Sequence, residues 1–371
     1  MKPELFIGAL SGTSIDGIDV ALVAFAPQPA LVASHSLPYP DDLRRELLAL
    51  CSPGENEIDR LGRADVLAGR CFAQAVHELC AKAARSADAI GAIGSHGQTI
   101  RHRPGHAAPF TLQIGDPNVI AALTGIPVAA DFRRKDMALG GQGAPLVPAF
   151  HEAVFRKNGA DRVVVNIGGI ANLTVLPGRA GAALAGFDTG PGNTLLDAWS
   201  RRVLQQPMDR DGALAARGVL VPKLLAALLA DPYFKQLPPK STGPEYFSLA
   251  WLERHLAAAG PVAAADVQAT LLALTVQTIA AAIRQAAGTG PAGVYVCGGG
   301  ALNGKLMSAL REQLPGSTVE PTDVLGVPAG WVEAMAFAWL ARQRWHALPG
   351  NCPVVTGASR PAVLGGLFLP S

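Results

Sequence analysis

The sequence predicts an α/β protein built from two similar lobes, and three observations support this expectation. Short apolar runs bounded by glycine or polar turns alternate with longer stretches that carry apolar residues at helical spacing. Two strand–turn–strand units with glycine- and hydroxyl-rich turns begin near residues 5 and 163. At 371 residues, the chain is also too long for one ordinary core.

The expected elements follow the chain in order. Strands are predicted from short apolar runs at 5–10, 20–25, 89–95, 163–167, 173–176 and 293–297. Helices are predicted from apolar spacing at 59–84, 194–203, 265–287, 304–314 and 331–345. The proline-flanked stretch at 238–244 is expected to be a surface loop.

Composition excludes several classes of protein. Hydrophobic residues make up 49% and charged residues 16%, a balance that argues against disorder. The net charge is +2 without runs of like charge, so we expect neither nucleic acid nor a membrane surface as a partner. The cysteines, five in number and without paired metal-site spacing, fit a reduced cytoplasm. Because acids follow the first apolar run, we do not expect a signal peptide. Polar residues interrupt the apolar stretch at 263–283, which we expect to be a buried helix.

Three turns have the composition of phosphate- or nucleoside-binding loops. Glycine lets a ligand approach the backbone, and hairpin tips direct N–H groups and hydroxyls at one point. The residues that we expect at a nucleotide are Gly12, Thr13, Ser14, Asp16, Gly17 and Asp19 in the first turn, Asn166, Gly168 and Gly169 in the second, and Gly298, Gly299, Gly300 and Asn303 in the third. Each turn alone is also compatible with a purely structural role. No GxxxxGK[ST] occurs, and no GxGxxG follows the first strand, so neither a P-loop nor a Rossmann site is predicted.

The segment GFDTGPGN at 186–193 is the densest candidate for catalysis. Asp188 stands between an apolar residue and a glycine–proline turn, before a helix expected to start near Thr194. A moderately desolvated carboxylate at such a position suits a general base. The alternative is that Asp188 only stabilises its turn or caps the helix.

Seven segments together resemble the anhydro-N-acetylmuramic acid kinase family, and the three turns resemble the phosphate and adenosine elements of the wider actin, Hsp70 and sugar-kinase superfamily. The segments, which span nearly the whole chain in order, are SGTSIDGID (11–19), SHGQT (95–99), ADFRRKDMALGGQGAPLVPAFH (130–151), NIGGIANLT (166–174), GFDTGPGN (186–193), GGGALN (298–303) and WVEAMAFAWLA (331–341). The resemblance implies a two-lobed actin-like ATPase (RNase H-like) fold with the nucleotide in the interlobe cleft. It implies an N-terminal lobe of residues 1–127 joined by residues 340–371, and a C-terminal lobe of residues 128–339.

The resemblance also implies the reaction. Water opens the 1,6-anhydro ring of anhydro-N-acetylmuramic acid, and the released O6 takes the γ-phosphoryl group of ATP, giving N-acetylmuramic acid 6-phosphate and ADP in cell-wall recycling. By resemblance Asp188 deprotonates the water. We further hypothesise that one carboxylate suffices, because the phosphoryl group replaces the proton that a glycosidase's acid would donate.

The sugar site is expected to contain His96, Gln98, Asp131, Arg133 and Glu333. A guanidinium matches the lactyl carboxylate of the sugar, which favours Arg133. A structural role remains open for His96, and a role in complementing the helix dipole remains open for Glu333. The final helix is expected to pack on the N-terminal lobe, and the family suggests a homodimer.

The sequence departs from many superfamily members at Leu10 and Asn166, where an acid is usual. We therefore expect no protein-built metal site, with Mg²⁺ held mainly by ATP phosphates and water near Asp16, Asp19 or Asp188. Three other functions stay open: a sugar-binding regulator, a kinase for another sugar, and an actin-like filament or chaperone ATPase.

Overall fold

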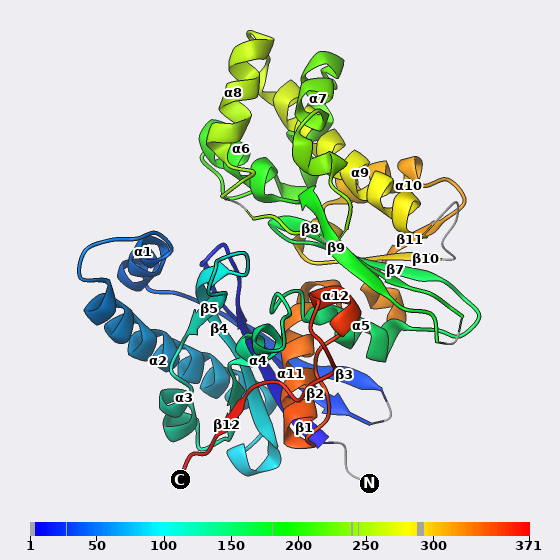
Figure 1. Ribbon diagram of the computed structural model, residues 1–371. Coiled ribbons are helices and arrows are strands. Elements are labelled where there is room, and N and C mark those ends of the chain that lie inside the picture. Colours follow the sequence, from blue (N-terminus) through cyan, green and yellow to red (C-terminus); the bar gives the residue numbers. More distant parts are fainter. Residues whose placement is uncertain (1–3, 27, 180, 239, 244, 288–292) are drawn as a thin grey trace. The chain divides into compact units, whose positions relative to one another are not determined.

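The computed structural model describes residues 4–26, 28–179, 181–238, 240–243, 245–287 and 293–371, which are drawn in colour in Figure 1. The chain forms two compact units. The first contains Met1–Val154 and Trp331–Ser371, and the second contains Phe155–Gly330.

The first unit is built on a mixed sheet of order β12-β6-β4-β1-β2-β3, with β5 paired to β4. Its first three strands are antiparallel neighbours, whereas β4 runs parallel to both β1 and β6. The strands of this sheet are β1 (Glu4–Ser11), β2 (Gly17–Phe25), β3 (Pro29–Pro38), β4 (Ala92–Arg103), β5 (Phe110–Ile114), β6 (Val128–Ala130) and β12 (Gly366–Phe368).

The helices of the first unit pack around this sheet, and their apolar faces bury the core. The long α2 contacts β2 and β3, and α11 contacts β1 and β4. The helices are α1 (Asp41–Leu50), α2 (Glu57–Ala83), α3 (Pro117–Thr124), α4 (Phe132–Ala138), α5 (Val147–Phe155), α11 (Val332–Trp345) and α12 (Pro353–Thr356). Because α11 belongs to this unit, the predicted packing of the final helix on the N-terminal part of the chain is confirmed.

Two glycines bring α11 close to the sheet. A Cβ atom on Gly8 of β1 would lie 1.7 Å from the carbonyl oxygen of Ala334, and one on Gly94 of β4 would lie 2.0 Å from that of Phe337. Any side chain at either glycine would therefore push the helix away. The contact fixes the start of α11, where Glu333 lies.

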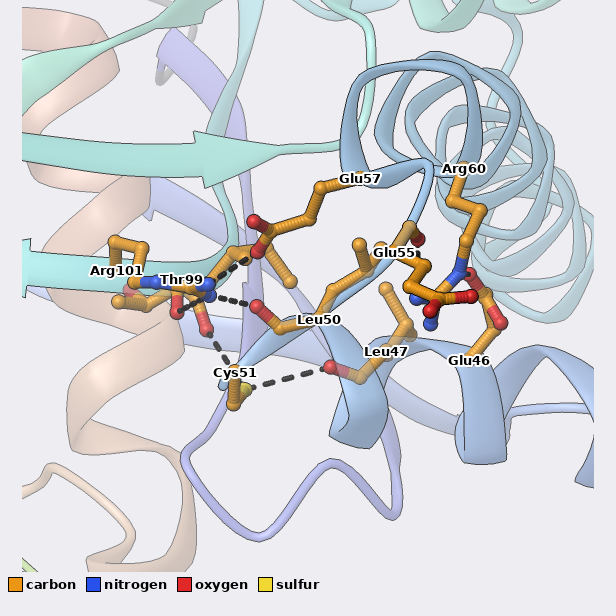
Figure 2. Close-up of polar contacts among 10 residues, drawn as sticks. Glu46, Leu47, Leu50, Cys51, Glu55, Glu57, Arg60, Thr99 and Arg101 are labelled. Carbon is orange, nitrogen blue, oxygen red and sulfur yellow. Dashed lines mark hydrogen bonds and ion pairs between the residues drawn. The ribbon is translucent and has the colours of Figure 1, made fainter. Parts of the chain in front are cut away.

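The joint between α1 and α2 is tied to β4 by polar contacts, as Figure 2 shows. Arg101 of β4 donates to the carbonyl oxygen of Leu50 and forms an ion pair with Glu57 at the start of α2. Arg60 bridges the two helices through a 2.7 Å ion pair with Glu46. The C-terminal part of β4, which is less buried than its start, is thereby held against this joint.

The second unit repeats the strand order of the first. Its sheet has the order β11-β10-β7-β8-β9, with antiparallel pairs β7–β8 and β8–β9 and parallel pairs β7–β10 and β10–β11. The strands are β7 (Arg162–Ile167), β8 (Ile170–Leu176), β9 (Ala185–Pro191), β10 (Gly293–Cys297) and β11 (Thr318–Pro321). Five strands of the first sheet, in the order β6-β4-β1-β2-β3, have the same order and directions as the five strands of the second, which confirms the predicted α/β class and the predicted similarity of the two units.

Helices also cover the second sheet, and the most buried of them is α9, which packs on β7, β8 and β9. They are α6 (Thr194–Leu204), α7 (Pro222–Leu229), α8 (Leu249–Ala259), α9 (Ala264–Ala287) and α10 (Gly304–Gln313). Within the described ranges α9 alone is long and apolar enough to cross a membrane, but most of it is buried in the core, as predicted.

Short 3₁₀ turns connect several of these elements. They are η1 (Ala87–Ala89), η2 (Arg210–Gly212), η3 (Ala215–Arg217), η4 (Pro232–Lys235), η5 (Gly299–Leu302), η6 (Thr322–Leu325) and η7 (Ala329–Trp331).

The unit boundaries at 154/155 and 330/331 differ from the expected lobe boundaries at 127/128 and 339/340. Residues 128–154 group with the first unit because β6 pairs with β4 and α11 packs on β6. Residues 332–339 group with it because they belong to α11, which packs on β1 and β4.

Candidate active site

The first glycine-rich turn is tied to the middle of β4. Ser11 Oγ donates to Gln98 Oε1 at 2.6 Å, and Gln98 Nε2 donates to the carbonyl oxygen of Gly12 at 3.3 Å. Both side chains are buried. Gln98, which the sequence suggested as a sugar ligand, is therefore placed where it orients the hairpin.

The tip of this turn presents Gly12, Thr13, Ser14 and Asp16 to solvent. Exposed hydroxyls and a glycine at a tight turn are the arrangement expected of a phosphate-binding tip. Asp19 instead accepts a 2.5 Å hydrogen bond from Ser36 of β3. A Cβ on Gly17 would lie 2.5 Å from the carbonyl oxygen of Leu37, so this glycine serves strand pairing.

In the second unit, the second turn meets the third at the carboxyl ends of β7 and β10, where Asn166 is paired with Cys297. A Cβ on Gly298 would lie 2.4 Å from Asn166 Oδ1, and one on Gly300 would lie 2.3 Å from the Ile167 side chain. Asn166 Oδ1 is buried and has no hydrogen-bond partner among the described residues. A buried acceptor without a partner is costly and fits a site completed by a ligand.

The segment before α6 closes around the second turn. The backbone N–H of Asn193 donates to the carbonyl oxygen of Gly168 at 2.8 Å, and those of Gly192 and Thr194 donate to that of Gly169 at 2.9 and 3.0 Å. Asn193 Nδ2 also donates to the carbonyl oxygen of Ile167 at 3.0 Å. The turn is thus held rigidly in its own unit.

The remaining residues of the third turn have identifiable local roles. Asn303 caps α10 by accepting a 3.0 Å hydrogen bond from the Leu306 N–H. Gly299 is exposed. The atom nearest to a Cβ placed on it would be Asn193 Nδ2, at 3.5 Å, so the backbone is open to solvent here.

Asp188 lies within β9, opposite Asn172 of β8, rather than in a turn. Its Oδ2 accepts a 3.0 Å hydrogen bond from the Thr242 N–H, and its backbone N–H donates to the carbonyl oxygen of Lys240 at 3.2 Å. No described residue donates to Oδ1. One carboxylate oxygen is therefore fixed, and the other is left to accept a further donor.

The environment of Asp188 makes its carboxylate more basic. Burial raises the pKa of Asp188 from 3.8 to about 6, against the opposing effects of the Thr242 N–H and the Lys240 charge. The side chain keeps some solvent exposure. A carboxylate whose pKa is near the working pH is an effective general base.

Three residues around Asp188 were missed by the sequence analysis: Tyr233, Lys240 and Thr242. Tyr233 donates its hydroxyl to the Asp188 carbonyl oxygen at 2.8 Å. Residues 240–242 fall in the expected surface loop, but they pack on Asp188. The sequence signal was a lysine followed by serine, threonine and glycine between prolines, a polar composition that suits contact with a charged group.

The first unit brings three of the expected sugar-site residues together. Arg133 Nε and Nη2 lie 3.1 and 2.8 Å from His96 Nε2, and Arg133 Nη1 donates to the carbonyl oxygen of Gly143 at 2.9 Å. Burial lowers the pKa of Arg133 to about 10, while the charges of Glu333 and Asp136 raise it. Arg133 and Glu333 therefore act on each other electrostatically.

His96 is neutral in this arrangement. Its Nδ1–H donates to the carbonyl oxygen of Gly97 at 2.8 Å, which leaves Nε2 as the acceptor for Arg133. Burial and the Arg133 charge lower the pKa of His96 to about 3. Its ring packs against Phe337 of α11 at 4.8 Å between centroids.

Asp131 forms an ion pair with Arg134 at 2.6 Å, and the Arg134 side chain is mostly exposed. In the part of the chain that the structure describes, no group of three or more His, Cys, Asp or Glu residues could hold a metal ion.

Comparison with known proteins identifies one family over almost the whole chain. The model of the family described as anhydro-N-acetylmuramic acid kinase matches residues 4–370. The chain is 56% identical over 369 residues to the anhydro-N-acetylmuramic acid kinase of Shewanella amazonensis, with 99% of each chain covered. It is 55% identical over 368 residues to that of Shewanella frigidimarina, with the same coverage.

Solved structures with distant similarity cover a comparable span. An activator of 2-hydroxyisocaproyl-CoA dehydratase from Clostridium difficile with bound ADPNP matches at a TM-score of 0.47 and 12% identity, covering 92% of this chain and 96% of that one. A ROK family glucokinase from Streptomyces griseus in complex with glucose and AMPPNP matches at a TM-score of 0.41 and 15% identity, covering 91% and 99%.

Proposed function

Because the chain belongs to the anhydro-N-acetylmuramic acid kinase family, we propose that it phosphorylates anhydro-N-acetylmuramic acid with ATP and opens the 1,6-anhydro ring with water. The products are N-acetylmuramic acid 6-phosphate and ADP. The observation that carries the proposal is the carboxylate of Asp188, half-buried, fixed at one oxygen and with its pKa raised to about 6.

Asp188 is the general base of this reaction. Water attacks the anomeric carbon, its proton passes to Asp188, and the bond from that carbon to O6 breaks. The O6 electron pair forms a bond to the γ-phosphorus, while the bond from phosphorus to the β-bridging oxygen breaks and ADP leaves. Asp188 then releases its proton to solvent. Because the phosphoryl group captures O6, no second carboxylate has to protonate it.

The glycine turns hold the phosphate groups of ATP. In the first unit the exposed Gly12, Thr13 and Ser14 supply N–H groups and hydroxyls. In the second unit Gly168 and Gly169 supply backbone, Gly298 and Gly300 let the third turn pack closely on Asn166 and Ile167, and the exposed Gly299 leaves room for the nucleoside.

Mg²⁺ is the expected companion of ATP, and the residues present fit it. Mg²⁺ takes oxygen ligands and keeps several waters. Asp16 is an exposed carboxylate at the first turn, and Asn166 Oδ1 is a buried acceptor without a described partner. Each of these oxygens, within its own unit, would be available as an acceptor for the hydrated ion, which neutralises phosphate charge when bound.

The sugar is held by Arg133, Glu333 and Asp131, with His96 as support. Three of the five N–H groups of Arg133 already have acceptors within the protein. The other two bind the lactyl carboxylate of the sugar. The neutral His96 fixes the guanidinium, so that the substrate meets a preorganised cation.

Product analysis in ¹⁸O-labelled water tests the proposal. The protein is incubated with ATP, Mg²⁺ and either anhydro-N-acetylmuramic acid or N-acetylmuramic acid. We expect turnover of the anhydro-sugar, with one ¹⁸O at the anomeric hydroxyl and none in the phosphate. Phosphorylation of N-acetylmuramic acid alone would indicate a kinase for another sugar. Turnover of neither sugar would favour a regulator or an ATPase.

We further propose a cytoplasmic homodimer acting in cell-wall recycling. Light scattering after size-exclusion chromatography tests the oligomeric state, and a monomeric mass would contradict it.

A further inference from the structure

A short segment of the chain, Lys240 to Thr242, runs alongside Asp188 and contacts it at two points. The Lys240 carbonyl oxygen accepts the Asp188 N–H at 3.2 Å, and the Thr242 N–H donates to Asp188 Oδ2 at 3.0 Å. Backbone contacts therefore keep Lys240 at a fixed place relative to the carboxylate.

Aromatic rings hold the Lys240 side chain. Its Nζ lies 4.8 Å from the ring centroid of Tyr233 and 6.0 Å from that of Phe187, and it donates to the Tyr233 carbonyl oxygen at 3.5 Å. The faces of aromatic rings attract cations. Tyr233 in turn donates its hydroxyl to the Asp188 carbonyl oxygen at 2.8 Å.

The charge of Lys240 acts on Asp188 without a contact ion pair. Among the described residues no ion pair links the two side chains, yet each affects the ionisation of the other: Lys240 lowers the pKa of Asp188, and Asp188 raises that of Lys240. Burial acts in the opposite direction on both. Tyr233 is the other titratable described group that faces Asp188, and its pKa is raised by burial and by that carboxylate.

From this geometry we propose that Lys240 is a positioning residue for Asp188, supplying a fixed positive charge that favours the carboxylate while leaving Oδ1 open to water. The inference rests on the proposed role of Asp188 as general base. A direct ion pair would occupy the oxygen that must accept a proton, whereas a cation held at a distance by aromatic rings does not.

The first test is the pH dependence of kcat/KM for the anhydro-sugar in Lys240→Met, Lys240→Arg and a control, Lys235→Met. Lys235 is an exposed lysine at the end of η4, on the same connection. We expect Lys240→Met to move the acid limb up by about half to one pH unit, because the nearby charge is lost. Lys240→Arg should restore most of that shift, and Lys235→Met should leave the limb in place.

The alternative role for Lys240 is direct binding of an anionic group of the substrate. That role would raise KM in Lys240→Met with kcat and the acid limb unchanged, and this result would overturn the proposal.

A second test needs no activity. The difference in free energy of unfolding between the wild type and Asp188→Asn changes with pH between the unfolded-state and the folded-state pKa of Asp188, and it levels off above the folded-state value. We expect Lys240→Met, introduced into both proteins, to move this upper limit up by about half to one pH unit. An unmoved upper limit would refute the coupling, even if the sugar proved not to be the substrate. A moved upper limit in a protein without turnover would support the coupling and contradict only the proposed function.

Discussion

Arg133 donates two hydrogen bonds to a single atom of His96, with its Nε 3.1 Å and its Nη2 2.8 Å from the imidazole Nε2. A buried guanidinium that loses its acceptor is left poorly solvated. In the proposed sugar site, this relationship would let a histidine that carries no charge at neutral pH hold the guanidinium that binds an anionic sugar.

Replacing His96 by leucine should therefore destabilise the protein by about 1–3 kcal/mol and raise KM for the sugar, because Arg133 loses its acceptor. His96→Gln, which retains an acceptor oxygen, should recover part of both effects. Chemical denaturation and steady-state kinetics measure them. Equal behaviour of the two variants would contradict the account.

The free energy of unfolding should fall as Asp188 ionises, up to about pH 6. Its folded pKa, about 6, exceeds the ordinary value of 3.8, so its stabilising contribution is complete below 3.8 and lost as the pH rises through 6. At pH 7 the ionised side chain should cost about 2–3 kcal/mol. Asp188→Asn should therefore gain stability relative to the wild type between pH 4 and 7. A difference that stays constant with pH would contradict the raised pKa.

Asn166 provides a test of the proposed role of its turn in nucleotide binding. Its Oδ1 is a buried acceptor without a described partner, so Asn166→Leu should leave the ligand-free protein unchanged or stabilise it by up to about 2 kcal/mol. The same variant should weaken ATP binding, measured by calorimetry. Ser200→Ala is the control, since Ser200 Oγ in α6 is also buried without a described partner. Loss of ATP affinity in the control, or none in Asn166→Leu, would refute the assignment.

A substitution at Gly8 tests the close packing of α11 on β1. Because a Cβ there would lie 1.7 Å from the Ala334 carbonyl oxygen, Gly8→Ala should destabilise the protein by about 3 kcal/mol or more. Gly62, inside α2, has nothing within 4 Å of the same hypothetical atom. Gly62→Ala should instead stabilise by about 0.5–1 kcal/mol. Thermal unfolding distinguishes these opposite signs.

The sequence predicts the long elements because their apolar patterns are strong and local. The buried strand at 293–297 and the helix at 304–314 are examples, and both are present with closely similar bounds. The short β6 and β12 were missed, since three residues carry no clear period and their pairing joins residues more than two hundred positions apart.

The candidate site is predictable only in part, for a similar reason. Asp188 and the glycine turns stand out through composition. The contacts of Lys240 and Thr242 with Asp188 depend on a connection of about fifty residues folding back on β9, and no local pattern encodes that return. Likewise, the pairing of His96 with Arg133 requires β4 and α4 to be adjacent in space.

The most direct measurement of the central claim is single-turnover phosphorylation of the anhydro-sugar by Asp188→Asn with ATP and Mg²⁺. The amide keeps an oxygen for the Thr242 N–H but cannot take a proton from water. We expect the rate of ring opening to fall by about 10²–10⁴-fold, with sugar and ATP still bound. A rate equal to that of the wild type would show that Asp188 is not the base.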